Sequence, residues 1–336
     1  MNPTIALEEI YAPIESAIQA IPDVTLGILA TPNPLAQEVI QYFFSEQGKL
    51  LRPALTLFGA EIVRQNKGPG AVSPDKSNLM RLAAAFEIFH AATLVHDDIV
   101  DSAYLRRNLP TVNVRWGPQI AVLVGDYLHV RAVEAFFETK SEKIAARFME
   151  TAGAVCDGEI RELREKYNLN LTQADYFDIL GKKTASLLSC CIEAGAILAE
   201  GSPEEAGALG RYGRYFGLAF QIVDDCLDFT GEEHEFGKTL GADYTAGVLT
   251  LPLIRLLEIA RPRDRETVIA AFKSNKELSK FQMILELIRE YQTVPYALAQ
   301  ARAFSAKARA ELSLFSDSPA KRSLDRLLDY VLERNR

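Results

Sequence analysis

The 336-residue sequence predicts an all-α protein, a single large helical bundle with a central apolar cavity. Apolar residues recur with the three-to-four-residue period of an amphipathic helix along almost the whole chain. No alternating apolar and polar run is joined to another by a tight Asn-Gly turn, the usual sign of a hairpin. No Ser/Gly-rich or Pro-rich linker divides the chain, so we expect residues 1–336 to form one domain.

Helix starts and breaks are well marked. A capping residue precedes a proline at Asn33-Pro34, Ser202-Pro203 and Ser318-Pro319, and proline is favoured at the first position of a helix. Ser202 and Glu205 also have the spacing of a capping box. Breaks are expected at 67–77, at 108–110 and in a glycine-bearing loop over 230–247. Roughly a dozen helices result from this division.

Composition excludes several classes of protein. Hydrophobic residues make up 48% and charged residues 24%, which is too apolar for a disordered chain. A net charge of −8 argues against a general nucleic-acid binder. No stretch of about 20 apolar residues is long enough to span a membrane. The N-terminus lacks the basic and apolar regions of a signal peptide, so a cytoplasmic protein is expected.

The four cysteines show no Cys-x-x-Cys pair of the kind that binds metals. Each lies in a helix-like segment: Cys156, Cys190, Cys191 and Cys226. We therefore expect four reduced, buried thiols.

Two predicted helices, 82–100 and 215–229, are apolar on nearly all sides, as helices at the centre of a bundle are. Each nevertheless ends in an acidic cluster. The clusters are Asp97, Asp98 and Asp101, and Asp224, Asp225 and Asp228. Residues four apart share a helix face, so the first and last acid of each cluster point the same way.

Three carboxylates on a buried helix repel one another, and leaving them unpaired is costly. One such cluster would fit a solvated helix end or a set of salt bridges equally well. Two copies, each on an apolar helix, instead favour a hard divalent cation such as magnesium, which takes oxygen ligands and shares them with substrate phosphates. If the two helices face each other, all six acids would frame one metal-filled cavity.

Such a cavity needs a polyanion and cations around it, and a diphosphate suits it. Arginine side chains bind phosphate oxygens bidentately. Taken singly, each basic residue is more often a surface charge, and a lone histidine is more often a core residue. The candidates are Lys49 and Arg52, spaced i,i+3 at an expected helix start, His90, Arg106, Arg107, Lys183 and Lys238.

At this point the chain resembles the trans-isoprenyl diphosphate synthases, the polyprenyl synthetase family, of medium- or long-chain type. The matching pieces are GKLLRP, HAATLVHDDIVDSAYLRR, VGDYL, KTASL, FQIVDDCLDF and GKTLGAD. The resemblance implies the isoprenoid synthase fold, a homodimer and a cluster of about three magnesium ions. It also implies condensation of isopentenyl diphosphate with an allylic diphosphate, giving a lipophilic product that would be handed to a membrane.

The resemblance also implies a role for each matching residue. The main metal ligands would be Asp97, Asp101 and Asp224, supported by Asp98, Asp225 and Asp228. The allylic diphosphate would be held by Arg106, Lys183 and Lys238. Isopentenyl diphosphate would be held by Lys49, Arg52, His90 and Arg107, while Thr184 and Gln221 would lie along the reacting carbons. Three positions depart from the family pattern: Asn108 replaces a glycine, Val248 a lysine and Asp157 a glutamine.

Product length would be set beneath Asp97. Thr93, one turn below, and Ala92 beside it are small, which argues against the shortest products. Phe89 lies two turns down, about 12 Å along the axis, and Phe86 lies deeper. If Phe89 points into the tunnel, growth would stop at about 20–25 carbons, whereas about 30–50 would be reached if it turns aside. Both could equally be ordinary core residues; the histidine before the Asp pair and the uninterrupted motif favour the longer range.

Two other functions remain open. A class I terpene cyclase shares this fold and one Asp-rich motif, but its second motif typically combines Asn or Asp with Ser or Thr and Glu. A non-catalytic subunit of a heteromeric synthase should have lost one acidic motif, and both are intact here.

Overall fold

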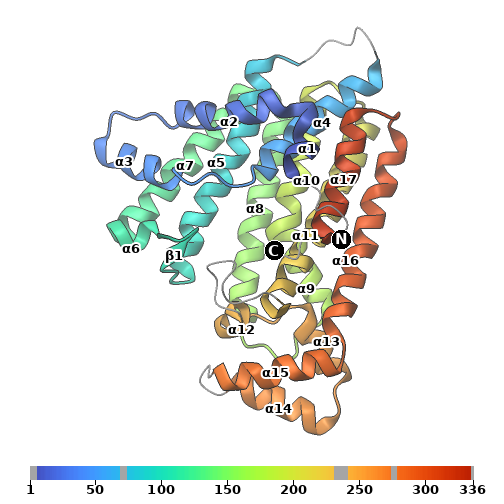
Figure 1. Cartoon of the computed structure of the whole chain (residues 1–336). Helices are drawn as coiled ribbons and strands as arrows, with labels where there is room; N and C mark the ends of the chain where they lie inside the picture. The colour runs from blue at the N-terminus through green and yellow to red at the C-terminus, as the bar shows by residue number, and fades with distance from the viewer. Residues whose placement is uncertain (1–5, 69–73, 231–240, 274–277, 334–336) are drawn as a thin grey trace.

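The computed structural model describes residues 6–68, 74–230, 241–273 and 278–333, and almost all of them are helical (Figure 1). The all-α prediction is therefore confirmed. One continuous cluster of buried apolar side chains runs from Ile10 to Val331. The assignment of the whole chain to a single domain stays a prediction.

The N-terminal helices lie across one end of the bundle, with α2 crossing the top in the view of Figure 1. These elements are α1 (Leu7–Tyr11), a 3-10 turn (Ala12–Ile14), α2 (Glu15–Ile28) and α3 (Pro34–Phe43). As predicted, Asn33 caps α3, because its side chain accepts from the backbone N–H groups of Leu35 and Ala36 at 3.1 and 3.2 Å.

Long helices form the body of the bundle: α4 (Leu51–Lys67), α5 (Lys76–Val100), α7 (Pro118–Glu138), α8 (Glu142–Glu165), α10 (Ser186–Leu198) and α11 (Pro203–Thr230). Helix α5 packs on α7, and α10 packs on both α4 and α11. Gly59 and Gly195 allow the close crossing of α4 and α10. A Cβ at Gly195 would lie 1.9 Å from the carbonyl oxygen of Thr56, so no larger residue fits there.

A small hairpin follows α5 and is the one β element of the described residues. Strand β1 (Leu105–Arg106) pairs antiparallel with β2 (Leu109–Pro110), and α6 (Val112–Trp116) comes next. Its two-residue turn consists of Arg107 at φ +50° and Asn108 at φ +64°. Two positive φ angles suit a hairpin turn, and asparagine tolerates them better than most residues. Asn108 can therefore stand in for the glycine of the family pattern.

The remaining elements close the other end and one side of the bundle. They are α9 (Gln173–Leu180), a π-helical segment (Gly181–Ala185), α12 (Ala242–Ala246), α13 (Leu251–Ile259), α14 (Pro262–Lys273), α15 (Leu278–Glu290), α16 (Thr293–Glu311), a 3-10 turn (Leu312–Leu314) and α17 (Pro319–Glu333). Helices α14 and α15 lie across the bottom in Figure 1, and α16 packs along α11.

Two expectations need correction. Of the glycine-bearing loop predicted over 230–247, residues 231–240 lie outside the described residues, and 242–246 form the short helix α12, whose first N–H groups donate to Asp228. Of the four cysteines, all free, Cys156 is exposed rather than buried. The capping box of Ser202 and Glu205 is confirmed, with contacts of 2.8 and 3.2 Å. No helix in the described ranges is long and apolar enough to cross a membrane.

Candidate active site

Helix α5 carries the first acidic cluster at its C-terminal end. Asp97 is half-buried, and burial, reinforced by the nearby charge of Glu159, raises its pKa to about 7. Asp101 is exposed at the helix end, where Lys166 reaches its Oδ1 at 3.3 Å. The predicted i,i+4 pair thus consists of one acid partly withdrawn from water and one at the surface.

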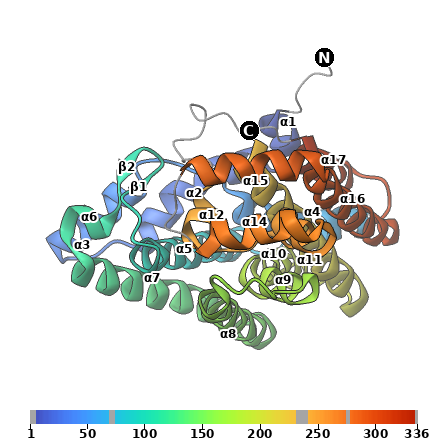
Figure 2. The same cartoon turned by 90° about the horizontal axis from the view of Figure 1, so that it is seen from below.

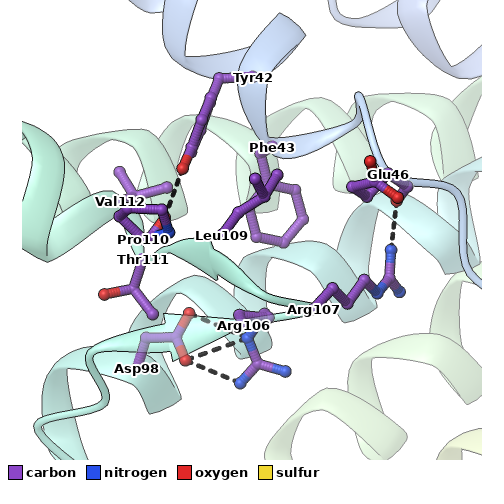
Figure 3. A pocket seen from close by; sticks show the side chains of 10 residues that line it. All are labelled: Tyr42, Phe43, Glu46, Asp98, Arg106, Arg107, Leu109, Pro110, Thr111 and Val112. Carbon is purple, nitrogen blue, oxygen red and sulfur yellow. Dashed lines mark hydrogen bonds and ion pairs between the residues drawn. The ribbon is translucent and has the colours of Figure 1, made fainter. Parts of the chain in front are cut away.

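Asp98 points toward the hairpin and is 2% exposed. The guanidinium of Arg106 grips both of its oxygens, with Nε at 3.0 and 2.9 Å and Nη2 at 2.8 Å (Figure 3). Arg106 therefore lies beside the first acidic cluster, as expected. It reaches the cluster from strand β1 and pairs with the middle acid, Asp98. Its role on a diphosphate, and that of Asp98 on a metal, stay predictions.

Helix α11 carries the second cluster. Asp225 is buried and accepts from the Tyr176 hydroxyl at 2.6 Å and from Gln221 Nε2 at 2.9 Å. Burial raises its pKa to about 7; the two hydrogen bonds oppose this effect, and the charge of Asp224 adds to it. Asp224 is half-buried, and Asp228 caps α12 through the backbone N–H groups of Ala242 and Asp243.

The GKKTA piece forms the π-helical segment, which presents Lys183 and Thr184 in consecutive positions. Single π turns inside helices occur frequently at functional sites. Lys183 forms ion pairs with Glu159, at 2.9 Å, and with Glu162. Gly158 of α8 makes room for this segment, since a Cβ there would lie 2.7 Å from the backbone nitrogen of Lys183.

The acids of α8 act on both clusters. The charge of Glu159 raises the pKa of Asp97, and the opposite charge of Lys183 lowers it. The charge of Glu162 contributes to the raised pKa of Asp225. The ends of α5 and α11 therefore face a common charged region around Lys183. Within the described residues, however, no three acid, histidine or cysteine side chains are close enough to hold an ion together. The carboxylates still fit a divalent cation chemically, because such an ion would offset the cost of ionising half-buried Asp97 and can complete its shell with substrate oxygens.

The basic residues of the GKLLRP piece take different positions from those predicted. Helix α4 begins at Leu51, so Lys49 precedes it and does not share a helical face with Arg52. Lys49 is exposed, with its amine 5.6 Å from the centre of the Tyr330 ring, and its carbonyl accepts from the Tyr11 hydroxyl at 2.9 Å. Arg52 points inward, and its buried Nε has no hydrogen-bond partner.

A cavity of about 150 Å³ lies between α2, the segment before α4, and α5. Its polar lining includes Glu87, His90 and Arg107, and Glu87 Oε2 is buried without a partner. Burial lowers the pKa of His90 well below its usual range, and the charges of Arg52, Arg106 and Arg107 lower it further. The Arg107 guanidinium lies close against Gly48 at the rim, since a Cβ there would lie 2.5 Å from Arg107 Nη2. The four residues assigned to isopentenyl diphosphate thus divide into inward-facing Arg52 and His90, Arg107 at the rim, and Lys49 outside.

The residues below Asp97 form a packed wall. Ala92 is fully buried, and the Thr93 hydroxyl bonds back to the His90 carbonyl at 2.9 Å. Phe89 is 1% exposed, with its ring 5.0 Å from Phe148 of α8 and 5.2 Å from His129 of α7. Phe86 joins the same aromatic cluster through Phe136 and Phe148.

Several residues of this region were not singled out from the sequence. They are Glu87, Glu159, Glu162, Lys166 and Tyr176. The spacing of Glu159 and Glu162, three apart on one helix, was the available signal for those two. Lys238 lies outside the described residues. Of the two remaining departures, Asp157 pairs with Lys182 at 2.7 Å, and half-buried Val248 donates its N–H to the Asp243 carbonyl.

Comparison with known proteins matches this arrangement to one family. The family model described as polyprenyl synthetase matches residues 33–288. The chain is 35% identical over 308 residues to a short chain isoprenyl diphosphate synthase of Methanothermobacter thermautotrophicus, covering 90% of this chain and 91% of the relative. It is 30% identical to the octaprenyl diphosphate synthase of Escherichia coli, covering 96% and 98%.

Comparison with solved structures supports the same family. A polyprenyl synthase from Caulobacter crescentus, described as complexed with calcium and isoprenyl diphosphate, superimposes with a TM-score of 0.91 at 31% identity over the whole of both chains. From its sequence and its fold, the chain belongs to the polyprenyl synthetase family of prenyltransferases, which use isopentenyl diphosphate and allylic diphosphates.

Proposed function

We propose that this protein is a magnesium-dependent trans-prenyltransferase that lengthens an allylic diphosphate with isopentenyl diphosphate. The observation that carries the proposal is the pair of acidic helix ends, on α5 and α11, whose charges converge on the Lys183 ion pairs of α8. Membership of a family that uses these two substrates supports it independently.

Asp97, Asp101 and Asp224 would hold the magnesium ions, with Asp98, Asp225 and Asp228 in support. The bound metal would stabilise the charge that develops on the departing diphosphate. Support comes from the Caulobacter crescentus relative, which is described with a divalent cation and a diphosphate. Half-buried Asp97 would gain from such an ion, because burial disfavours its charge.

The protein's own cations would position the substrates. Lys183 already contacts two carboxylates, and a diphosphate in the same region would compete with Glu159 and Glu162 for its amine. Arg106, which Asp98 holds in place, and Lys238 would bind the same diphosphate. Arg52, His90, Arg107 and Lys49 would bind isopentenyl diphosphate at the cavity beside α5. Thr184 and Gln221 would direct oxygen dipoles at the cation, and the departing diphosphate would take the proton.

The product would be a polyprenyl diphosphate of about 30–50 carbons, with growth passing the small residues Thr93 and Ala92 and continuing beyond Phe89, which lies about 12 Å along α5. Phe89 lies among the rings of α7 and α8, which supports the longer range. A twenty-carbon product is the alternative, since relatives include both octaprenyl and geranylgeranyl diphosphate synthases.

A homodimer would cover an exposed apolar face on α7 and α8. Leu123, Val130 and Phe137 are 63%, 55% and 63% exposed, and their spacing of seven residues places them on one stripe of α7. Met149, Cys156 and Ile160 are exposed on α8, which lies beside α7 in Figure 2. Patches of this kind mark interfaces, and a second copy would bury them symmetrically.

Incubation of the purified protein with magnesium, radiolabelled isopentenyl diphosphate and several allylic primers tests the proposal. We expect labelled polyprenyl diphosphates and released diphosphate, and loss of both when a chelator removes the metal. A terpene cyclase would leave isopentenyl diphosphate unconsumed. A non-catalytic subunit would release no diphosphate from any primer, and either result would overturn the proposal.

A further inference from the structure

Four side chains from α9, the π-helical segment and α11 form one continuous chain of hydrogen bonds. The Tyr176 hydroxyl donates to Asp225 Oδ2 at 2.6 Å, and Gln221 Nε2 donates to Asp225 Oδ1 at 2.9 Å. The Thr184 hydroxyl then donates to Gln221 Oε1 at 3.0 Å. Tyr176 is 3% exposed and Asp225 is 6% exposed, so little water can replace these donors.

The chemistry of the donors fixes the direction of every bond in this chain. Asp225 accepts on both of its oxygens, so the amide of Gln221 turns its NH₂ end toward this carboxylate. Its carbonyl end then faces Thr184, whose single hydroxyl proton is used in that contact. Thr184 then has only oxygen lone pairs left to offer, and Gln221 keeps one free lone pair on Oε1 beside its second N–H. Under the proposed function, on which this inference rests, oxygen dipoles are what a developing allylic cation requires.

We propose that Tyr176 is a positioning residue for prenyl transfer: its hydroxyl fixes the Asp225 carboxylate, and through it the orientation of the Gln221 amide and the Thr184 hydroxyl. Tyr176 lies on the other side of Asp225 from these two groups, so it acts through the hydrogen-bond chain rather than by contact with substrate. Asp225 itself accepts one protein hydrogen bond on each oxygen, which suits an anchor for this chain.

Tyr176→Phe tests the proposal because it removes the hydroxyl and keeps the ring. A hydrogen bond to a charged group is worth about 1.5–3 kcal/mol, which corresponds to a fall in kcat of roughly 10- to 100-fold if the orientation of Gln221 is lost. We expect KM for both diphosphates to change less than about twofold, since the cations and metal hold them. Wild-type kcat in the folded Tyr176→Phe protein would overturn the proposal.

Tyr212→Phe provides the matched control. Tyr212 is also fully buried, and its hydroxyl donates to the Leu324 carbonyl at 2.8 Å in a region formed by α11 and α17. Both variants lose one buried hydrogen bond and should melt at similarly lowered temperatures, but only Tyr176→Phe should lose kcat. Equal losses of kcat in the two variants would show that general destabilisation explains the effect.

A double-mutant cycle with Gln221→Leu identifies the route of the effect. If Tyr176 acts through Gln221, the Tyr176→Phe change should lower kcat less than about twofold once Gln221 is already leucine. Additive losses would overturn the proposal, as would wild-type kcat in the Gln221→Leu single variant, which can be measured even if Tyr176→Phe fails to fold. A wild-type enzyme that transfers no prenyl group would instead overturn the proposed function itself.

Discussion

Arg106 closes on Asp98 with three contacts of 2.8–3.0 Å, and thereby ties the hairpin to the end of α5. The middle acid of the second cluster, Asp225, is likewise held on both oxygens by protein donors. In each cluster the middle aspartate is thus the most buried acid and faces a side chain assigned to the substrates. The middle acids hold side chains that we propose to contact substrate, and the outer acids remain the more accessible candidates for metal.

Asp98→Asn should weaken binding of the allylic diphosphate, because Arg106 loses the charge that orients it. Arg106 is 33% exposed, so water screens part of the interaction and we expect the low end of the usual range, about 1–1.5 kcal/mol, or roughly tenfold in the allylic KM. Steady-state kinetics with varied primer would measure this. Asp317→Asn, which removes the partner of Arg322 on the exposed surface, is the control and should behave as wild type. An unchanged KM in Asp98→Asn would mean that Arg106 needs no anchor.

Without metal, the protein should lose stability as pH rises through the range in which Asp97 ionises. Its pKa is raised from 3.8 to about 7 in the folded chain, so the folded state retains a proton that the unfolded state has released. Stability from this group is therefore full below about pH 4 and falls until about pH 7, by at most about 1.4 kcal/mol per pH unit.

Asp97→Asn isolates this effect. Buried His90, whose pKa is lowered, changes stability in the opposite sense near pH 6, and the difference between wild type and variant cancels its contribution. We expect thermal melting of metal-free protein to show equal stability at about pH 4 and a more stable variant at pH 8. Parallel curves for the two proteins across this range would contradict the raised pKa of Asp97.

The sequence predicted those features of the site that depend on spacing within one helix. The acids at i and i+4, the apolar faces of α5 and α11, and the helix caps all follow from short-range pattern. The hairpin was missed because each strand has only two residues and its turn is Arg-Asn rather than Asn-Gly. The π-helical turn has no sequence pattern to reveal it.

Contacts between residues far apart in the chain also could not be predicted from the sequence. Tyr176 and Asp225 are 49 positions apart, and nothing local marks that tyrosine as anything other than a core residue. Lys49 was placed on a helix because GKLLRP reads as a helix start, whereas Leu50 adopts φ +48° and delays the helix to Leu51. A left-handed residue at a leucine is not foreseeable from propensity, because tertiary packing imposes it.

Leu123→Glu with Val130→Glu should convert the proposed homodimer into monomers. Two charges in the middle of the apolar stripe on α7 would face their own copies across a two-fold interface, where like charges repel. Sedimentation velocity would report a halved mass. Met283→Glu on α15 also charges an exposed apolar side chain and should leave the mass unchanged. A wild-type protein that already sediments as a monomer would rule out the dimer.

Phe89→Ala distinguishes the two product lengths. It should lengthen a product of about 20–25 carbons by at least one isoprene unit, because Phe89 is then the floor about 12 Å below Asp97, and it should leave a product of about 30–50 carbons unchanged. Removing a fully buried phenylalanine costs about 3–5 kcal/mol, so product analysis by chromatography is best done at reduced temperature. Phe86→Ala, one turn deeper in the same aromatic cluster, should have a smaller effect on length at a similar cost in stability. Phe58 of α4 is buried and its ring packs near that of Tyr11. Phe58→Ala should therefore destabilise the protein without altering the product. An unchanged product distribution in Phe89→Ala would exclude Phe89 as the floor of the tunnel, because a side chain that limits chain growth cannot be shortened without admitting further carbons.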